Sequence, residues 1–290
     1  MRNLLVPCDG SESALQAVRH AAAKALTESE VEIHLLHVIE PMTPVTLSEA
    51  FSAQRLDERF PPQAAQALEP AVAALPKTGV RFTFHCSFGL PAPEIAAYAK
   101  SAGCDEVIMG TRGRGAFANL MIGSVATQVV ELVNIPVTLV KKFAPPAGND
   151  MEKVLVPCDG SDTALRAVRY AAGLVHGHPD SKLELLHVLN PTKHRFDTAL
   201  SSDDLTRLSP DEFVTVLRPA RELLNAYGIP YEVHCRAGDP ASQIADHIAH
   251  AGSTSVVMGT RGLGLMGNLV IGSVAARVAS CAQVPVTLIK

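Results

Sequence analysis

The sequence lacks the features that mark several broad classes of protein. Its six cysteines form no C-x-x-C pair, which argues against a disulfide framework and against a zinc ribbon. The longest apolar runs have the length of a strand and are too short to cross a bilayer. The N-terminal apolar run, Leu4 to Cys8, is too short for a signal peptide. The composition therefore predicts a protein of the reducing cytoplasm with no membrane partner.

A strong excess of either charge is also missing. The chain has 25 Lys plus Arg against 29 Asp plus Glu, which gives a net charge of −4. Residues 1–150 carry −3 (12 minus 15) and residues 151–290 carry −1 (13 minus 14). Neither half has the basic excess that nucleic-acid binding usually needs, so we expect no nucleic-acid partner. Hydrophobic residues make up 47% of the chain, which is enough for a globular core.

The chain repeats itself with a period of about 150 residues. Residues 4–22 and 154–172 agree at 14 of 19 positions, and residues 107–126 and 256–275 agree at 14 of 20. This period is far longer than that of a solenoid repeat, so it indicates one domain copied in tandem. We expect domains at residues 1–142 and 152–290, joined by a linker at residues 143–151 that is rich in proline, alanine and glycine.

Each copy alternates short apolar strands with amphipathic helices. In the first copy the pattern predicts a loop or lid at residues 41–62, strands at residues 3–7, 31–38, 80–87, 106–110 and 136–141, and helices at residues 11–26, 63–75, 93–101 and 124–133. The second copy follows the same order. The fold class is therefore α/β, with each copy forming an open, doubly wound, Rossmann-like parallel sheet of five strands. We expect the strand order 3-2-1-4-5, which brings the ends of the first and fourth strands into one crevice.

The most distinctive sequence follows the fourth strand of each copy. Gly110-Thr-Arg-Gly113 is followed after nine residues by Gly123-Ser124, and Gly259-Thr-Arg-Gly262 is followed after nine by Gly272-Ser273. Glycines let backbone amides approach a phosphate closely, and the N-terminus of the following helix favours an anion. A flexible turn with a helix cap is the alternative. The loop is neither a Walker A loop, since no Gly-Lys-Ser/Thr occurs, nor a dinucleotide fingerprint.

Charged residues flank these loops in both copies. Asp9 and Asp159 follow the first strand, where a carboxylate can accept a hydrogen bond from a ribose hydroxyl or an adenine amine, or contact a metal on the phosphates. The alternative is an Asx turn shared with the next serine. Arg112 and Arg261 can pair with phosphate, although exposed loop arginines usually have no specific role.

Histidine and cysteine positions suggest a weaker, enzymatic hypothesis. Cys8 and Cys158 end the first strands, and His37 and His187 end the neighbouring second strands, which offers a thiol and a base. The alternative is a small buried cysteine. The pairs His85-Cys86 and His234-Cys235 recur in the third strand, but adjacent strand residues point to opposite faces. We therefore expect no catalytic residue and no metal site formed by protein side chains alone.

The glycine pattern, with an aspartate after the first strand, resembles the nucleotide-binding branch of the universal stress protein family. The resemblance covers nearly the whole chain as two tandem domains. It implies an ATP site in each copy, with Mg²⁺ as a possible companion of the phosphates. In the first copy the implied contacts are Pro7, Asp9, Val38, Met109, Gly110, Gly113, Gly123, Ser124 and Val125. In the second copy they are Pro157, Asp159, Val188, Met258, Gly259, Gly262, Gly272, Ser273 and Val274.

The two copies differ inside the glycine loop, where Arg114 corresponds to Leu263 and Phe117 to Met266. The fifth strands are apolar, and in the expected order they lie at a sheet edge that needs cover. Because members of the family resembled here pair such edges, the resemblance implies an intrachain pseudo-dimer through the fifth strands. A homodimer of the chain is a further possibility.

The sequence thus favours an ATP-binding cytoplasmic stress-response protein that acts as a nucleotide sensor or signalling module. No general base stands beside the phosphate loop and no P-loop lysine is present, so fast ATP hydrolysis is not predicted. One alternative is a slow ATPase or a nucleotidyl-type transferase at the same site. Another is a scaffold that binds no nucleotide.

Overall fold

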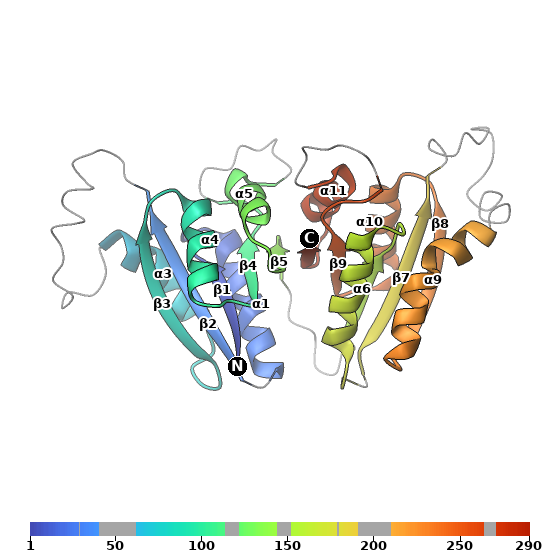
Figure 1. Ribbon diagram of the computed structural model, residues 1–290. Coiled ribbons are helices and arrows are strands. Elements are labelled where there is room, and N and C mark those ends of the chain that lie inside the picture. Colours follow the sequence, from blue (N-terminus) through green and yellow to red (C-terminus); the bar gives the residue numbers. More distant parts are fainter. Residues whose placement is uncertain are drawn as a thin grey trace. The chain divides into compact units, whose positions relative to one another are not determined.

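The computed structural model describes residues 1–28, 30–40, 62–113, 122–143, 152–178, 180–190, 210–263 and 271–290. Two compact units are present, Met1–Phe143 and Ala144–Lys290 (Figure 1). Of the expected linker at residues 143–151, only Phe143 is among the described residues. Of the expected loop at residues 41–62, only Pro62 is among them. Arg114, Phe117 and Met266 also lie outside them. The bounds of the linker stay a prediction.

The first unit has the strand order that the sequence predicts. Its five strands are parallel and run in the order β3-β2-β1-β4-β5 across the sheet. They are β1 (Arg2–Pro7), β2 (Val31–Ile39), β3 (Arg81–Phe88), β4 (Glu106–Gly110) and β5 (Val137–Val140). Strands β1 and β4 pair directly, with Leu4 opposite Glu106. The strand order therefore reverses between β1 and β4, which makes this the switch point that the sequence predicts.

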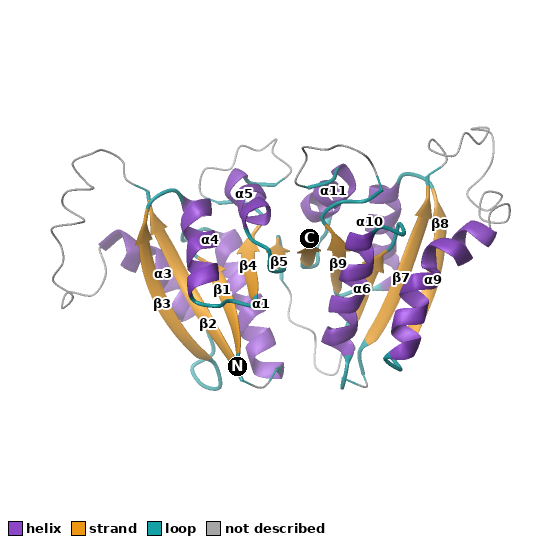
Figure 2. Ribbon diagram, in the orientation of Figure 1, coloured by secondary structure: helices purple, strands orange, loops and turns teal. Residues whose placement is uncertain are grey.

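Helices cover both faces of this sheet (Figure 2). They are α1 (Glu12–Thr27), α3 (Pro62–Ala73), α4 (Pro91–Ser101) and α5 (Ser124–Leu132). Helix α1 packs beside α3 on one face, and α4 packs beside α5 on the other. The start of α4 lies two residues earlier than predicted, because Pro91 is accepted in the first turn, where its missing N–H has no intrahelical partner.

Small side chains set how closely α1 lies on the sheet. The buried face of α1 consists of Ala14, Ala17, Val18, Ala21, Ala22 and Ala25, a spacing of three and four residues that forms one helical stripe. This stripe packs on buried strand residues such as Leu4 and Ile108. Since β1 and β4 are both covered by α1, the loops that leave their carboxyl ends are held side by side.

The second unit repeats this architecture. Its parallel strands run in the order β8-β7-β6-β9-β10. The strands are β6 (Lys153–Pro157), β7 (Lys182–Leu189), β8 (Tyr231–Ala237), β9 (Ser255–Gly259) and β10 (Val286–Ile289). The helices are α6 (Asp162–Val175), α9 (Pro210–Ala226), α10 (Pro240–Ala251) and α11 (Ser273–Cys281). Helix α6 packs beside α9, and α10 packs beside α11. Among the helices of the described residues, none combines the length and the apolar character that a membrane span needs.

Candidate functional site

Each candidate loop leaves the sheet beside the end of the first strand of its unit. The loop after β1 and the loop after β4 meet where the carboxylate of Asp9 lies against the backbone of Gly113. In the second unit the carboxylate of Asp159 lies against the backbone of Gly262 in the same way. The segments that the sequence analysis singled out are thus brought together at the carboxyl edge of each sheet, where open α/β sheets bind ligands.

Asp9 forms an Asx turn. Its Oδ1 accepts a hydrogen bond from the backbone N–H of Ser11 at 2.9 Å, and Ser11 Oγ accepts one from the N–H of Ala14 at 3.2 Å. In the second unit Asp159 Oδ1 accepts from the N–H of Ser161 at 3.0 Å. Such a turn satisfies donors at the start of a helix that would otherwise lack a partner. One oxygen of each carboxylate is therefore committed to the fold.

The other oxygen of each aspartate faces the glycine loop. Asp159 Oδ2 accepts a hydrogen bond from the backbone N–H of Leu263 at 3.0 Å. A Cβ added at Gly113 would lie 2.6 Å from Asp9 Oδ2, and a Cβ added at Gly262 would overlap Asp159 Oδ2 as well. Neither glycine has a positive φ. Glycine is needed at these positions because the carboxylate occupies the space of a side chain, a reason that the sequence analysis did not identify.

The first glycine of each loop makes room for the start of a helix. A Cβ added at Gly110 would lie 2.7 Å from the backbone carbon of Ser13, and one added at Gly259 would lie 2.8 Å from Thr163 Cβ. The N–H of Arg112 donates to Ser13 Oγ at 3.4 Å, and Thr163 Oγ1 donates to the carbonyl of Arg261. Sequence reasoning missed Ser13 and Thr163, whose hydroxyls fasten the loop to the helix. The signal in the sequence that could have identified them is that Ser13 and Thr163, both hydroxyl residues, occupy matching positions of the repeat.

The loop closes at the start of the next helix. The N–H of Gly123 donates to the carbonyl of Thr111 at 2.8 Å, and the N–H of Gly272 donates to the carbonyl of Thr260 at 2.7 Å. Gly123 and Gly272 are the N-cap residues of α5 and α11, and among the described side chains none caps these helices. The N–H groups of the first turn are therefore open to an anion, and the helix dipole favours one.

The remaining predicted contacts differ in exposure. Ser124 and Ser273, the first residues of α5 and α11, are exposed. Arg112 and Arg261 are also exposed, and within the described part of the chain their guanidinium groups form no ion pair. The half-buried predicted contacts are Pro7, Val38, Val125, Pro157, Val188 and Val274. Met109 in β4 and Met258 in β9 are buried.

The thiol–imidazole hypothesis is not supported by the geometry. Cys8 is buried and its Sγ donates to the carbonyl of Val6 at 3.4 Å. His37 Nδ1 lies 2.7 Å from the carbonyl oxygen of Cys8, which can only accept, so this nitrogen donates to the backbone and does not face the thiol. The second unit is the same, with His187 Nδ1 at 2.7 Å from the carbonyl of Cys158. Burial, followed by the charge of Asp159, raises the pKa of Cys158 to about 12, so the thiol stays protonated.

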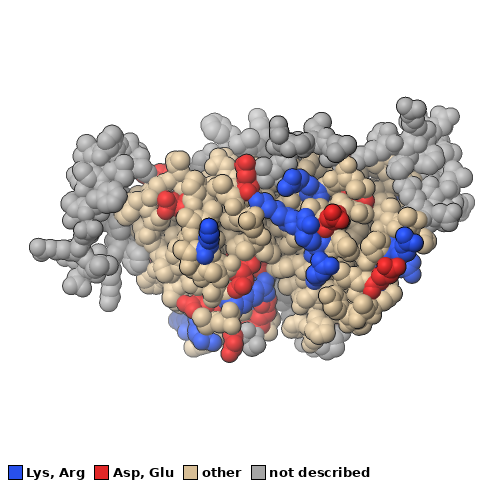
Figure 3. All heavy atoms as spheres, viewed as in Figure 1, with Lys and Arg blue, Asp and Glu red and all other residues tan. Residues whose placement is uncertain are grey.

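Charged side chains of both signs are intermixed on the face that Figure 3 shows, among a larger area of other residues. One exposed pair joins Arg277 on α11 to Asp239, the N-cap residue of α10, at 2.8 Å. The hydrogen bond from Arg277 lowers the pKa of Asp239 to about 2. This pair joins two helices on the same face of the second sheet.

Comparison with known proteins identifies one family twice along the chain. The profile of the universal stress protein family matches residues 1–141 and again residues 151–290. A universal stress protein of Thermus aquaticus is 33% identical over 141 residues, which cover 48% of this chain and 98% of that protein. Universal stress protein MJ0531 of Methanocaldococcus jannaschii is 29% identical over 141 residues, covering 49% of this chain and 82% of that protein.

A solved structure shares the fold over nearly the full length. The crystal structure of a universal stress protein from Archaeoglobus fulgidus is 24% identical, covers 99% of this chain and 96% of its own, and superimposes with a TM-score of 0.68. At this identity the likeness concerns the fold.

Proposed function

The chain belongs to the universal stress protein family, and on that premise we propose that each unit binds ATP at the carboxyl edge of its sheet. The observation that carries the proposal is the pair of open helix starts at Gly123 and Gly272, each beside an aspartate and a glycine loop. The same geometry occurs in both units. Repetition of an uncapped, exposed helix end at a strand switch point favours a ligand site over a flexible turn.

The phosphates are assigned to the starts of α5 and α11. The backbone N–H groups of Ser124 and Val125 are available there, and Ser124 Oγ is exposed and can donate another hydrogen bond. The dipole of an exposed helix start contributes about 0.3–1 kcal/mol toward an anion. A charge-assisted hydrogen bond contributes about 1.5–3 kcal/mol, and exposure to solvent reduces this. Arg112 and Arg261 are exposed, so they are expected to add a solvent-reduced contribution to that of the dipoles. Gly113 and Gly262 leave room for the carboxylates of Asp9 and Asp159 beside this edge.

The nucleoside is assigned to the ends of β1 and β2 and of β6 and β7. Pro7 and Val38 are half-buried there and offer apolar surface to a base, as do Pro157 and Val188. Asp159 Oδ2 accepts one hydrogen bond from Leu263 and has a second lone pair for a ribose hydroxyl. If Mg²⁺ accompanies the phosphates, it keeps several waters and needs only one or two carboxylate oxygens. Asp9 and Asp159 each place a carboxylate beside the glycine loop.

The proposed role is a stress-response module that senses or signals nucleotide state, in the cytoplasm. All six cysteines are free, which suits a reducing compartment. We further propose that the apolar edge strands β5 and β10 pair with each other or with a second copy. An edge of this kind needs cover to avoid aggregation.

The proposal is tested by denaturing the purified full chain and identifying any released small molecule by mass. An adenine nucleotide is expected from the wild-type protein. The matched control is the variant with both Gly113→Val and Gly262→Val, purified in parallel, which is expected to release far less. Release of no nucleotide, together with no ATP binding in a titration, would favour the scaffold alternative.

A further inference from the structure

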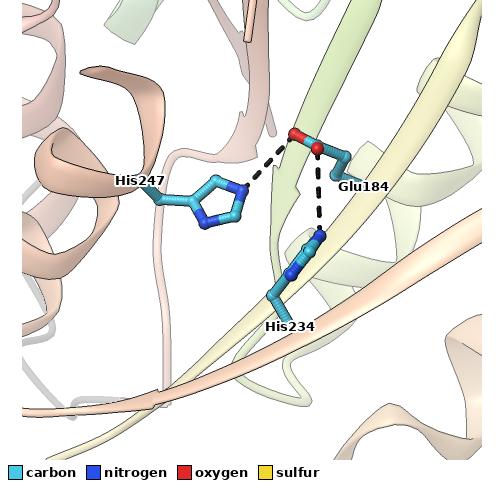
Figure 4. A group of neighbouring side chains, drawn as sticks. All are labelled: Glu184, His234 and His247. Atoms are coloured by element: carbon cyan, nitrogen blue, oxygen red, sulfur yellow. Dashed lines mark hydrogen bonds and ion pairs between the residues drawn. The ribbon is translucent and has the colours of Figure 1, made fainter. Parts of the chain in front are cut away.

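Three titratable side chains converge on the α10 side of the second sheet, away from the glycine loop. Glu184 comes from β7, His234 from β8 and His247 from α10 (Figure 4). Each offers one ligand atom, and these atoms all lie within 4.8 Å of one another. His247 Nε2 is 3.4 Å from Glu184 Oε2, and His234 Nε2 is 3.8 Å from Glu184 Oε1. No metal site formed by protein side chains alone is expected from the sequence, whose motifs include neither Glu184 nor His247.

The carboxylate of Glu184 is buried, and among the described residues no lysine or arginine forms an ion pair with it. Its side chain is 4% exposed, and within the described residues its partners are the hydroxyl of Ser253 at 3.0 Å and the two imidazoles. Glu106 in the first unit is equally buried, but it lies 2.6 Å from Arg2 and 2.8 Å from Lys24. Burying a carboxylate is costly unless a cation is paired with it. Glu184 therefore has the environment of a ligand for a cation that side chains do not supply.

Each imidazole presents its Nε2 atom to the carboxylate of Glu184, His247 at 3.4 Å and His234 at 3.8 Å. His234 Nε2 is buried and has no hydrogen-bond partner in the described part of the chain, although the ring as a whole is 34% exposed. The same nitrogen lies 3.7 Å from a carboxylate oxygen of the exposed Glu232. Imidazole is the commonest side-chain ligand for transition metals, and a ring nitrogen without a hydrogen-bond partner is available for that role.

The spacing of the three ligand atoms suits one shared ion. In a tetrahedral zinc site the ligand atoms lie about 2.1 Å from the metal, which places them about 3.4 Å from one another. His247 Nε2 lies 3.4 Å from Glu184 Oε2 and His234 Nε2 lies 3.8 Å from Glu184 Oε1, both close to this edge length. With one ligand atom taken from each residue, all three atoms lie within 4.8 Å of one another. Two histidines and one glutamate, with water in the remaining position, form the ligand set of open zinc sites. We propose that Glu184, His234 and His247 bind a divalent transition-metal ion of the zinc class in the second unit.

The first unit provides an internal comparison. In the first unit, His34 of β2 lies opposite Leu5 of β1. In the second unit, Glu184 of β7 lies opposite Leu155 of β6, the residue that matches Leu5. By the same repeat, His85 matches His234 and Tyr98 matches His247. His34 Nδ1 is hydrogen-bonded to Tyr98 Oη at 2.9 Å, and the His34 and His85 rings stack at 5.6 Å. His34, His85 and Tyr98 include no carboxylate. The proposed metal site is therefore assigned to the second unit alone.

Occupation of the site would connect three elements of one unit. Strand β8 is at the edge of its sheet, and the ion would join it to β7 and to α10. Metal that binds the folded state and not the unfolded state raises stability by mass action. We therefore expect Zn²⁺ to raise the midpoint of thermal unfolding of the full chain, and to do so independently of ATP.

The test uses the full chain after treatment with a chelator and its removal. Zn²⁺ binding is measured by competition with a chromogenic chelator, and Co²⁺ is added to record the visible absorption of a tetrahedral complex. One ion per chain is expected. Loss of even an outer partner of a metal ligand costs about 10–100-fold in affinity, so His247→Tyr and Glu184→Gln should each weaken Zn²⁺ by more than tenfold. Tyrosine is the residue that the fold accepts at the matching position of the first unit.

Matched controls separate this site from other histidines. His85→Ala in the first unit, and His178→Ala in the exposed loop after α6, should leave Zn²⁺ affinity unchanged. ATP binding should be retained in His247→Tyr, which also reports that the variant is folded. Absence of a one-to-one Zn²⁺ complex would overturn the proposal. Retention of full affinity in both Glu184→Gln and His247→Tyr, or its loss in His178→Ala, would overturn it as well.

Discussion

Asp159 holds the backbone of Leu263 through one carboxylate oxygen while the other oxygen holds the N–H of Ser161, each at 3.0 Å. This carboxylate links the turn after β6 to the glycine loop after β9. A ligand that contacts the aspartate therefore also acts on the loop. If ATP binds as proposed, its ribose and its phosphates are recognised by parts of the chain that are already hydrogen-bonded to each other.

The glycine loop of the first unit gives the first prediction. Gly113→Val, made in a Gly262→Val background so that one site is measured, should weaken ATP binding more than tenfold. The new Cβ would lie 2.6 Å from Asp9 Oδ2, so either the loop or the carboxylate must move. Calorimetric titration measures the affinity. Gly173→Ala is the control, because a Cβ there meets nothing within 4 Å. An unchanged affinity in the double variant would refute the role of this loop.

A second prediction concerns the difference between the two sites. Leu263 is 65% exposed and replaces the Arg114 of the first loop. A guanidinium near a triphosphate can add a charge-assisted hydrogen bond of about 1.5–3 kcal/mol, which solvent reduces. The first unit should therefore bind ATP more tightly than the second, with a smaller gap for AMP and at high salt. Each site is titrated with the other disabled by Ser124→Ala with Gly113→Val, or by Ser273→Ala with Gly262→Val. Equal affinities would show that Arg114 contributes nothing and that the groups common to both loops bind the nucleotide.

The buried Glu106 gives a prediction about stability. Burial alone would raise its pKa, but Lys24 and Arg2 beside it lower the pKa to about 2. Removing one partner of a buried ion pair typically costs about 3–5 kcal/mol. Because Arg2 remains, Lys24→Met should lower the free energy of unfolding at pH 7 by about 1–3 kcal/mol. Urea unfolding followed by circular dichroism measures this change.

The pH dependence follows from the lowered pKa of Glu106. The stability that the carboxylate contributes is fully present above its unfolded pKa of about 4.3 and is lost as the pH falls through about 2. The deficit of Lys24→Met should therefore be largest at neutral pH and shrink in acid. The matched control is Leu174→Met, because Leu174 is the residue of the second unit that matches Lys24. Its neighbour at the position of Glu106 is Ser255, which has no charge to lose. A deficit that does not change with pH would show that Lys24 acts by packing alone.

The edge strand of the first unit gives a fourth prediction. Residues 1–142 expressed alone should form a homodimer, because β5 ends the sheet order of this unit and its sequence from Val137 to Val140 is apolar except for Thr138. Light scattering over a range of concentrations measures the mass. A soluble monomer at high concentration would argue that this edge is covered within one domain.

Much of the fold could be predicted from the sequence, since the signals are local. Apolar runs of strand length, the Ser11 cap and the glycine after each fourth strand mark their elements directly. The start of α4 at Pro91 was missed, because proline is accepted in the first turn as readily as it ends a helix.

The candidate site was only partly predictable. Its glycines and aspartates are visible as a repeated pattern, whereas the contact between Asp9 and Gly113 depends on how two strands are placed side by side. Glu184, His234 and His247 are separated by 50 and 13 positions in the sequence. They meet because β7 pairs with β8 in one register and α10 packs on both strands. No spacing along the chain indicates such a group.

The most direct test of the proposed function is the stoichiometry of ATP binding to the nucleotide-free full chain, measured by calorimetry. The account predicts two sites per chain in the wild type, one in Gly113→Val, one in Gly262→Val and none in the double variant. Failure of the wild type to bind ATP, or binding that persists at two sites in the double variant, would contradict the assignment of the nucleotide to these loops.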